Sequence, residues 1–324
     1  MKCTNRYLCL ICAITVLLSG CGFNQVELEK EYDAYSFHKS FTNQDVSVNA
    51  DYFAKELCVS NAINFNTEGT YARVAKGAGV FNLTTDEVVY NLDIFQKLYP
   101  ASTTKILTAY IIIKDCDLNA VVTVSESAAN QAEDSSVCGL KAGDSITVND
   151  LLYGLMLKSG NDAAEALAEY HSGSVEAFAE VMTKEAHRLG ATNSQFKNPS
   201  GLPDKEHYTT VYDMYLIMRE AIKQEKFIDL ISTYKKPVKY KSANGSTVEK
   251  TFTSNSRYKS GEVETPKGFE VIGGKTGTTY DAGFCLVLYS KNSQGQEIIS
   301  IVFKADGRHN LYLLMNEILR KFAK

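Results

Sequence analysis

The sequence lacks the residue clusters that usually hold metals and the basic surface that nucleic acids require. Beyond the N-terminal apolar stretch, no cysteine belongs to a C-x-x-C pair, and the five histidines form no cluster, so no metal site is expected. The formal net charge is −4 at pH 7, which argues against nucleic acid as a main partner. No segment recurs in the manner of a repeat array.

Several catalytic and nucleotide-binding motifs are also missing. There is no G-x-S-x-G elbow to pair with a histidine, so a serine–histidine triad is not expected. Gly77-Ala78-Gly79 lacks the third glycine and the helix of a dinucleotide fingerprint. The Gly274-Lys275-Thr276 run is no phosphate loop, because Phe269 stands where that loop needs its first glycine. We therefore expect no cofactor.

What the sequence does contain is the composition of a folded protein. Apolar residues make up 44% of the 324 positions and charged residues 22%, which is typical of a soluble globular chain. This length can form one large domain or two ordinary ones, and it can bury a substantial core.

The N-terminal residues have the pattern of an export signal. Lys2 and Arg6 precede an apolar run, 8–18, that is too short to span a bilayer. The run ends in Leu-Ser-Gly-Cys21, which resembles the lipobox of bacterial lipoproteins. We predict a signal peptide over 1–20, a lipid-modified Cys21, and an extracytoplasmic, membrane-anchored protein; an ordinary signal cleaved nearby is the alternative. The polar, aperiodic stretch 21–50 is expected to be a tether.

Four cysteines remain once the signal and Cys21 are set aside: Cys58, Cys116, Cys138 and Cys285. A disulfide is chemically possible outside the cytoplasm, and the Cys116–Cys138 pair is the nearest in sequence. Free, buried cysteines that act as small hydrophobic residues are an equally good interpretation.

The strongest catalytic candidate is Ser102 with Lys105. Pro100 favours an extended residue before it, and 106–113 has the unbroken apolar character of a buried helix. Ser102 should therefore lie at a helix N-terminus, with Lys105 one turn away on the same face. S-x-x-K occurs five times in the chain, but only this copy precedes a long apolar helix. A serine beside an amine is a candidate nucleophile with its base.

Two further short motifs follow in a fixed order. Ser159-x-Asn161 falls on a tight turn between two predicted helices, and Lys275-Thr276-Gly277 falls on a predicted strand. Each motif is weak alone, because S-x-N occurs four times and Lys-Ser/Thr-Gly three times. Their order and their placement on helix, turn and strand make the combination specific.

Together these motifs resemble the penicillin-binding proteins and serine β-lactamases, and more closely the D-alanyl-D-alanine carboxypeptidase family. The matching segments are Tyr99-Pro100-Ala101-Ser102-Thr103-Thr104-Lys105, Lys158-Ser159-Gly160-Asn161-Asp162, Asn198-Pro199-x-Gly201-Leu202 and Gly274-Lys275-Thr276-Gly277. The resemblance implies an α+β fold, in which helices flank an antiparallel sheet, an all-α subdomain is added, and the active site lies at their junction. It implies a catalytic domain over 51–324 without the C-terminal β domain of many members.

The resemblance also implies a role for each motif residue. Ser102 is the expected nucleophile, Lys105 its general base and Ser159 a proton relay. Asn161 is expected to bind the substrate amide. The terminal carboxylate is expected at the β-strand motif, formed by Lys275, Thr276, Gly277 and Thr278. The backbone N–H groups of Ser102 and Thr278 are the expected oxyanion hole. The implied partners are peptidoglycan stem peptides and β-lactams. Ser200 stands where histidine is common in the family.

Physical chemistry explains the second lysine. The ordinary pKa of a lysine is about 10.4, so Lys105 can accept a proton only if its pKa is lowered. Burial and the nearby charge of Lys275 both act in that direction. Two alternative functions stay open: a class A type β-lactamase, whose Glu-x-x-Leu-Asn loop is missing between Asn161 and Lys275, and a non-catalytic lipoprotein that binds muropeptide or penicillin.

The remaining elements follow from periodicity and turn signals. Glycine at 190 is expected to end one amphipathic helix, and Asn244-Gly245 to join two strands in a hairpin. The expected strands are 73–81, 87–90, 121–124, 145–148, 238–241, 247–253, 283–289 and 297–304, and the expected later helices are 175–189, 210–221 and 311–322.

Overall fold

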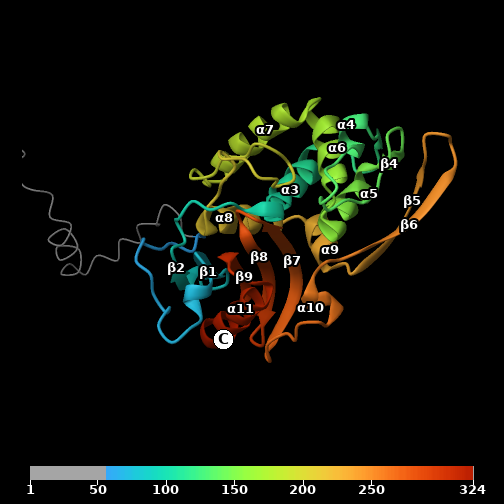
Figure 1. Cartoon of the computed structure of the whole chain (residues 1–324). Coiled ribbons are helices and arrows are strands. Elements are labelled where there is room, and N and C mark those ends of the chain that lie inside the picture. Colours follow the sequence, from blue (N-terminus) through green and yellow to red (C-terminus); the bar gives the residue numbers. More distant parts are fainter. Residues whose placement is uncertain (1–55, 324) are drawn as a thin grey trace, which may run out of the picture. The chain divides into compact units, whose positions relative to one another are not determined.

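The computed structural model describes residues 56–323 (Figure 1). The predicted signal peptide over 1–20, the lipid on Cys21 and the tether over 21–50 lie outside the described residues. Within 56–323, no helix combines the length and the apolar character needed to cross a bilayer.

The larger sheet has five antiparallel strands in the order β2-β1-β9-β8-β7. Its strands are β1 (Gly77–Asn82), β2 (Glu87–Leu92), β7 (Phe269–Thr279), β8 (Gly283–Asn292) and β9 (Glu297–Ala305). The N-terminal hairpin thus joins the C-terminal meander through the β1–β9 pair. This strand order leaves β7, which carries the Lys275 motif, at one edge of the sheet.

Alternating side chains place apolar residues on both faces of this sheet. On β8, Leu286 and Leu288 pack toward α11 (Arg308–Phe322), whereas Val287 and Tyr289 belong to the main core on the other face. Successive residues of a strand point to opposite faces, so a strand covered on both sides is apolar throughout. This explains why the β8 and β9 segments are almost continuously hydrophobic.

Helices cover the second face and build the other half of the molecule. Helix α3 lies at the centre of this half and contacts α6, α7, α8 and α9, while α8 packs on β1 and β9 (Figure 1). The helices are α3 (Lys105–Asp115), α4 (Glu126–Ala129), α5 (Val148–Tyr153), α6 (Asn161–Ser172), α7 (Val175–Arg188), α8 (Val211–Ala221), α9 (Glu225–Ser232) and α10 (Arg257–Ser260). Short 3-10 helices span Ala72–Val74 and Ala101–Thr104, and a π-helical turn spans Gly154–Lys158.

A second, four-stranded antiparallel sheet accompanies the helices, in the order β3-β4-β5-β6. Its strands are β3 (Val121–Thr123), β4 (Ser145–Thr147), β5 (Lys235–Lys241) and β6 (Thr247–Thr253). The β5–β6 hairpin projects away from the helices in Figure 1, and Gly245 at its turn has φ +82°. The helical half therefore contains strands, whereas an all-α subdomain was expected. Each of these strands was predicted individually. Their assembly into one sheet was not predicted, because β4 and β5 are far apart in the sequence.

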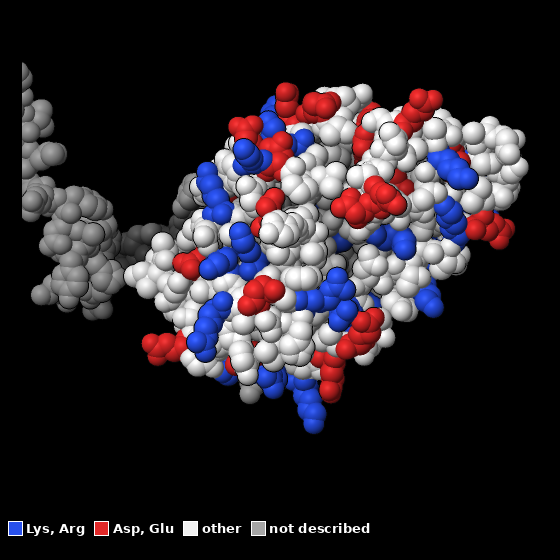
Figure 2. Space-filling view, viewed as in Figure 1, with Lys and Arg blue, Asp and Glu red and all other residues white. Residues whose placement is uncertain are grey.

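The α+β class is confirmed, and most predicted elements are present within one to three residues. The exceptions have local causes. The strand predicted from Arg73 begins only at Gly77, because a 3-10 turn precedes it, and α9 was not predicted. On the face seen in Figure 2, acidic and basic side chains are intermingled.

Candidate active site

The nucleophile candidate Ser102 lies in the 3-10 turn Ala101–Thr104, which runs directly into α3. Its predicted position at the start of a buried helix is confirmed. Ala101 has φ +48°, a left-handed conformation that a residue with a side chain seldom adopts. Such a conformation persists only where the surroundings hold it in place.

Lys105 is fully buried, and its ammonium group has three partners. Its Nζ donates to Ser102 Oγ at 3.1 Å, to Asn161 Oδ1 at 2.8 Å and to the Ser200 carbonyl at 2.7 Å. Burial lowers the pKa of Lys105 well below its usual range, and the positive charge of Lys275 lowers it further. The side chain is therefore a far better proton acceptor than an exposed lysine.

The third partner of Lys105 belongs to a loop that packs against the nucleophile turn. Asn198 Oδ1 accepts hydrogen bonds from the backbone N–H groups of Ser200, Gly201 and Leu202, at 2.8–3.2 Å, which fixes the loop. Gly201 has φ +86°, and a Cβ there would lie 1.8 Å from the Ala101 carbonyl oxygen. Only glycine allows this approach. Ser200 thus contacts Lys105 through its backbone carbonyl. Its hydroxyl donates a hydrogen bond to Asn198 Oδ1.

The second motif lies where two helical segments meet. The π-helical turn ends at Ser159, which has φ +59°, and Asn161 begins α6. Both side chains are buried, at 5% relative exposure. The turn therefore holds the Ser159 hydroxyl and the Asn161 amide in fixed positions. The prediction that Ser159 and Asn161 lie on a tight interhelical turn is confirmed.

Lys275 connects the strand motif to this turn. Its buried Nζ donates to Ser159 Oγ at 2.9 Å and to the Thr276 carbonyl at 2.9 Å. Burial lowers the pKa of Lys275 to about 7. Lys105 and Lys275 thus bind two neighbouring groups of one turn, Asn161 and Ser159 respectively. The three motifs converge at one place, as predicted.

Gly277 brings β7 against the nucleophile. A Cβ at Gly277 would lie 2.8 Å from the Ser102 backbone nitrogen and 2.9 Å from the Pro100 carbonyl oxygen. A side chain here would push the strand away from Ser102, so glycine is required by packing. Because of this close approach, Ser102 and Thr278 line the same cavity. Their backbone N–H groups were expected to form an oxyanion hole.

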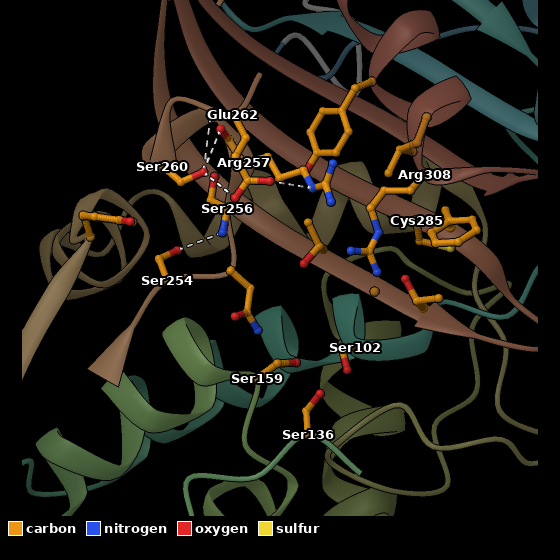
Figure 3. Close-up of a pocket in the computed structure, with 18 residues that line it drawn as sticks. Ser102, Ser136, Ser159, Ser254, Ser256, Arg257, Ser260, Glu262, Cys285 and Arg308 are labelled. Atoms are coloured by element: carbon orange, nitrogen blue, oxygen red, sulfur yellow. Dashed lines mark hydrogen bonds and ion pairs between the residues drawn. The ribbon is translucent and has the colours of Figure 1, made fainter. Parts of the chain in front are cut away.

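The cavity in front of Ser102 has a volume of about 410 Å³ and is lined mostly by polar residues (Figure 3). Ser102, Ser159, Thr276, Gly277 and Thr278 all line it. Its wall also includes Arg257, Glu262 and Arg308, which the sequence analysis did not single out. No motif spacing marks these residues. The one sequence signal for Arg308 is its position just before the helix predicted over 311–322; in the structure it is the first residue of α11.

Other candidates are placed away from the reacting groups. His207 is buried and its Nε2 lies 2.9 Å from Thr104 Oγ1, while its Nδ1 accepts from the Lys197 N–H at 3.2 Å. Burial lowers the pKa of His207 to about 4, so the ring is neutral and packs behind the nucleophile turn. His207 is therefore a packing residue.

The four described cysteines, Cys58, Cys116, Cys138 and Cys285, are free thiols, so the Cys116–Cys138 bridge is not formed. Cys138 packs instead against the turn at Gly160, where a Cβ would lie 2.4 Å from its Sγ. This packing occupies the Cys138 thiol, which explains why the pairing by sequence distance is wrong. Within 56–323, no group of three or more histidine, cysteine, aspartate or glutamate side chains is arranged to hold a metal ion.

Comparison with known proteins identifies this arrangement. A family model described as D-alanyl-D-alanine carboxypeptidase matches residues 65–307. The chain belongs to this carboxypeptidase family. The matched residues include all three motifs, and Arg308 lies directly after them.

Individual relatives agree with the family match. The chain is 35% identical over 243 residues to D-alanyl-D-alanine carboxypeptidase DacF of Bacillus subtilis, covering 72% of this chain and 58% of the relative. It is 35% identical over 219 residues to DacC of Escherichia coli, covering 65% and 51%. The chain thus spans little more than half the length of these curated carboxypeptidases.

A solved structure in the same family has a similar fold. The Streptomyces K15 DD-transpeptidase superposes with a TM-score of 0.70 at 29% sequence identity, covering 76% of this chain and 96% of that one. The likeness covers nearly the whole of that solved chain.

Proposed function

We propose that the protein is a serine-type carboxypeptidase that removes the terminal D-alanine from peptidoglycan stem peptides. The observation that carries this proposal is the buried Lys105 ammonium, 3.1 Å from the Ser102 hydroxyl and next to a second buried lysine. The family to which the chain belongs supports the choice of substrate.

Acylation begins when Ser102 loses its proton to Lys105. A neutral Lys105 has two N–H bonds, which can stay on Asn161 Oδ1 and the Ser200 carbonyl, so its lone pair can face the serine hydroxyl. Ser102 Oγ then attacks the carbonyl carbon between the two D-alanines, and Lys105 becomes an ammonium. The lowered pKa of Lys105 is what makes this transfer accessible near neutral pH.

The tetrahedral intermediate needs hydrogen-bond donors to stabilise its negatively charged oxygen. The backbone N–H groups of Ser102 and Thr278 border the same cavity and are the proposed oxyanion hole. One such donor contributes about 3 kcal/mol in other enzymes. The substrate carboxylate would lie by Lys275, Thr276 and Thr278, and Arg308 adds a cation to that wall.

Collapse of the intermediate transfers the proton that Lys105 took from Ser102 to the leaving amine, which leaves Lys105 neutral again. Ser159 is the proposed relay, because its Oγ accepts from Lys275 at 2.9 Å and its side chain faces the cavity. D-alanine leaves, and Ser102 remains as an ester of the shortened peptide. Water then attacks the ester, and its proton passes to the neutral Lys105 and from there to Ser102 Oγ, which regenerates the serine. β-Lactams would acylate the same serine.

We also propose that the enzyme works outside the cytoplasm and is anchored by lipid on Cys21. The support is the short apolar run and the lipobox-like residues before Cys21. Two or more acyl chains would hold it stably on a membrane.

The test is release of D-alanine from a pentapeptide that ends in D-Ala-D-Ala, followed with the purified full chain. We expect turnover by the native chain and at least a thousandfold loss in Ser102→Ala, because the nucleophile is gone. Ser242→Ala, at the exposed β5–β6 hairpin turn, is the matched control and should keep full activity. Equal release by the native chain and Ser102→Ala, or no release at all, contradicts the proposal. Rapid turnover of penicillin without peptide hydrolysis would favour a β-lactamase instead.

A further inference from the structure

The described part of the chain begins beside an exposed apolar loop. Residues 58–63, called the N-terminal loop below, hold Val59 and Ile63 with relative exposures of 66% and 70%. No other valine, leucine or isoleucine within 56–323 is as exposed. Single exposed apolar residues are common on protein surfaces, whereas two in one short loop indicate a contact surface.

The N-terminal loop is fixed on the sheet by a buried side chain. Asn91 of β2 has no exposed surface. Its Nδ2 lies 3.2 Å from the Ser60 hydroxyl and 3.1 Å from the carbonyl oxygens of Asn61 and Ile63. The loop backbone is therefore held in one conformation, and this conformation directs the Val59 and Ile63 side chains to the outside.

An apolar groove lies on the other side of the first described residue. Glu56 pairs with Arg219 at 3.0 Å, and Arg219 lines a groove of about 510 Å³. The chain therefore reaches the folded domain between this groove and the N-terminal loop. The apolar part of the groove consists of half-buried side chains: Leu83, Ile222, Ile228 and Ile272.

Cations border the apolar part of this groove. Arg219, Lys223 and Lys291 line it, and Glu297 is the one acid among its lining residues. Lys223 pairs with Glu220 and Lys291 with Glu297, in partly exposed ion pairs that contribute little. A lipid phosphate can replace such a partner at small cost. Apolar side chains bordered by lysine and arginine are typical of surfaces that lie on phospholipid.

The loop and the groove are remote from the cavity in front of Ser102. The loop is fixed to β2, whereas the Lys275 motif is on β7, at the opposite edge of the five-stranded sheet (Figure 1). Four strand spacings separate these edges by about 19 Å. Along β8, Cys285 lines the cavity and Lys291 lines the groove, which places them about 20 Å apart. The close-up in Figure 3 accordingly shows Ser102 and Cys285 but no residue of the loop or the groove.

We propose that the N-terminal loop and the groove form a docking face for a phospholipid bilayer, with Val59 and Ile63 in the boundary between headgroups and acyl chains. Glu56 follows Cys21 by 35 residues, so even a fully extended chain keeps this face within about 120 Å of a lipid on Cys21. Such a connection raises the concentration of the face at the bilayer, so a weak contact is sufficient. The active-site cavity then opens away from the membrane. This inference goes beyond D-alanine release and rests only on the proposed membrane anchor.

Tryptophan fluorescence tests the docking face, because the chain contains no tryptophan and one introduced indole reports only its own surroundings. The full chain is reconstituted in vesicles of phosphatidylglycerol and brominated phosphatidylcholine. We expect Ile63→Trp to lose about half of its fluorescence, since a side chain at this boundary is within contact of the bromines. Val59→Trp is a second probe at a similarly exposed position and should behave in the same way. Tyr280→Trp, fully exposed at the β7–β8 turn, is the matched control and should keep its fluorescence.

The contrary results are distinct. Equal quenching of Ile63→Trp and Tyr280→Trp, or none in either, would overturn the docking face. An unquenched Ile63→Trp with blue-shifted emission already in detergent would also overturn it, because a second copy or residues 1–55 would then cover the loop. Release of D-alanine in detergent should be the same for Ile63→Trp and the native chain, since the loop is remote from Ser102. No release by the native chain would contradict the carboxypeptidase proposal and leave the quenching result in force.

Discussion

The two sides of the active-site cavity are built in different ways. On one side, the nucleophile turn Ala101–Thr104 and the loop around Gly201 are pressed together, with backbone atoms in contact and the Lys105 ammonium surrounded by acceptors. On the other side, the cavity is bordered by residues 254–262, called the outer wall below. This wall holds Arg257 and Glu262, which have side-chain exposures of 35% and 58% and form one long ion pair.

This difference indicates which side of the cavity sets reactivity. The pKa of a lysine falls only where water is excluded and its N–H groups have fixed partners, so the Lys105 side must be rigid and buried. The outer wall has no such constraint, since exposed charges can rearrange at small cost. Substitutions should therefore affect stability and chemistry together near Gly201, and have smaller effects on both at the outer wall.

The largest effect is expected from Gly201→Ala. Gly201 has φ +86°, and its new Cβ would lie 1.8 Å from the Ala101 carbonyl oxygen, so the loop or the nucleophile turn must shift. We expect the free energy of unfolding to fall by roughly 2–5 kcal/mol, from backbone strain and overpacking together. Acylation of Ser102 should fall as well, because the loop also positions the Ser200 carbonyl. Urea unfolding and penicillin acylation measure the two effects.

Gly261→Ala is the matched control in the outer wall. Gly261 has φ +78°, nearly the same conformation, but no atom lies within 4 Å of the added Cβ. Strain alone should cost about 1–2 kcal/mol. Equal losses of stability in Gly201→Ala and Gly261→Ala would show that the contact with Ala101 is unimportant, and the contrast between the two sides would be lost.

A second effect is expected in the pH dependence of acylation. The rate should rise with pH on the acid side, because Lys105 must be neutral to accept the Ser102 proton. It should fall on the alkaline side as Lys275, whose pKa is about 7, loses the charge that holds the substrate carboxylate. The decline should be about tenfold, the usual value of a charge-assisted hydrogen bond. The measurement is the rate constant for penicillin acylation between pH 5 and 10.

Lys275→Arg tests the assignment of the alkaline limb. Arginine keeps its charge over the whole range, so the decline above pH 7 should disappear while the acid limb remains. An unchanged alkaline limb in Lys275→Arg would assign that limb to another group.

The smallest effect is expected from Glu262→Gln. Its partner Arg257 is partly exposed and the carboxylate itself is exposed, at an Nε to Oε2 distance of 3.4 Å. The free energy of unfolding should therefore change by less than about 1 kcal/mol. Thermal and urea unfolding test this directly. A loss as large as that of Gly201→Ala would mean that the outer wall is as tightly built as the nucleophile side.

The catalytic motifs could be predicted because their geometry is local. Ser102 and Lys105 are three residues apart on a helix, and Ser159 and Asn161 share one turn, so spacing alone places each pair. The convergence of Lys275 with them could not be derived from spacing. It came from the family resemblance, since β7 reaches Ser102 only through the packing of Gly277.

Other parts of the site left no usable pattern in the sequence. The Ser200 carbonyl binds Lys105 through the backbone, which any residue supplies, so the side chain at 200 says nothing about this role. Arg257 and Arg308 lie in segments separated by β7, β8 and β9, and their common cavity depends on the whole sheet. The same limit applies to Cys138, whose packing against Gly160 was not visible in the cysteine spacing.

The central claim is that Lys105 activates Ser102, and the mass of the chain after treatment with benzylpenicillin tests it most directly. We predict one covalent adduct per chain, mapped by peptide digestion to Ser102, and no adduct in Lys105→Met under the same conditions. An adduct on another residue, or equally fast labelling of Lys105→Met, would contradict the account.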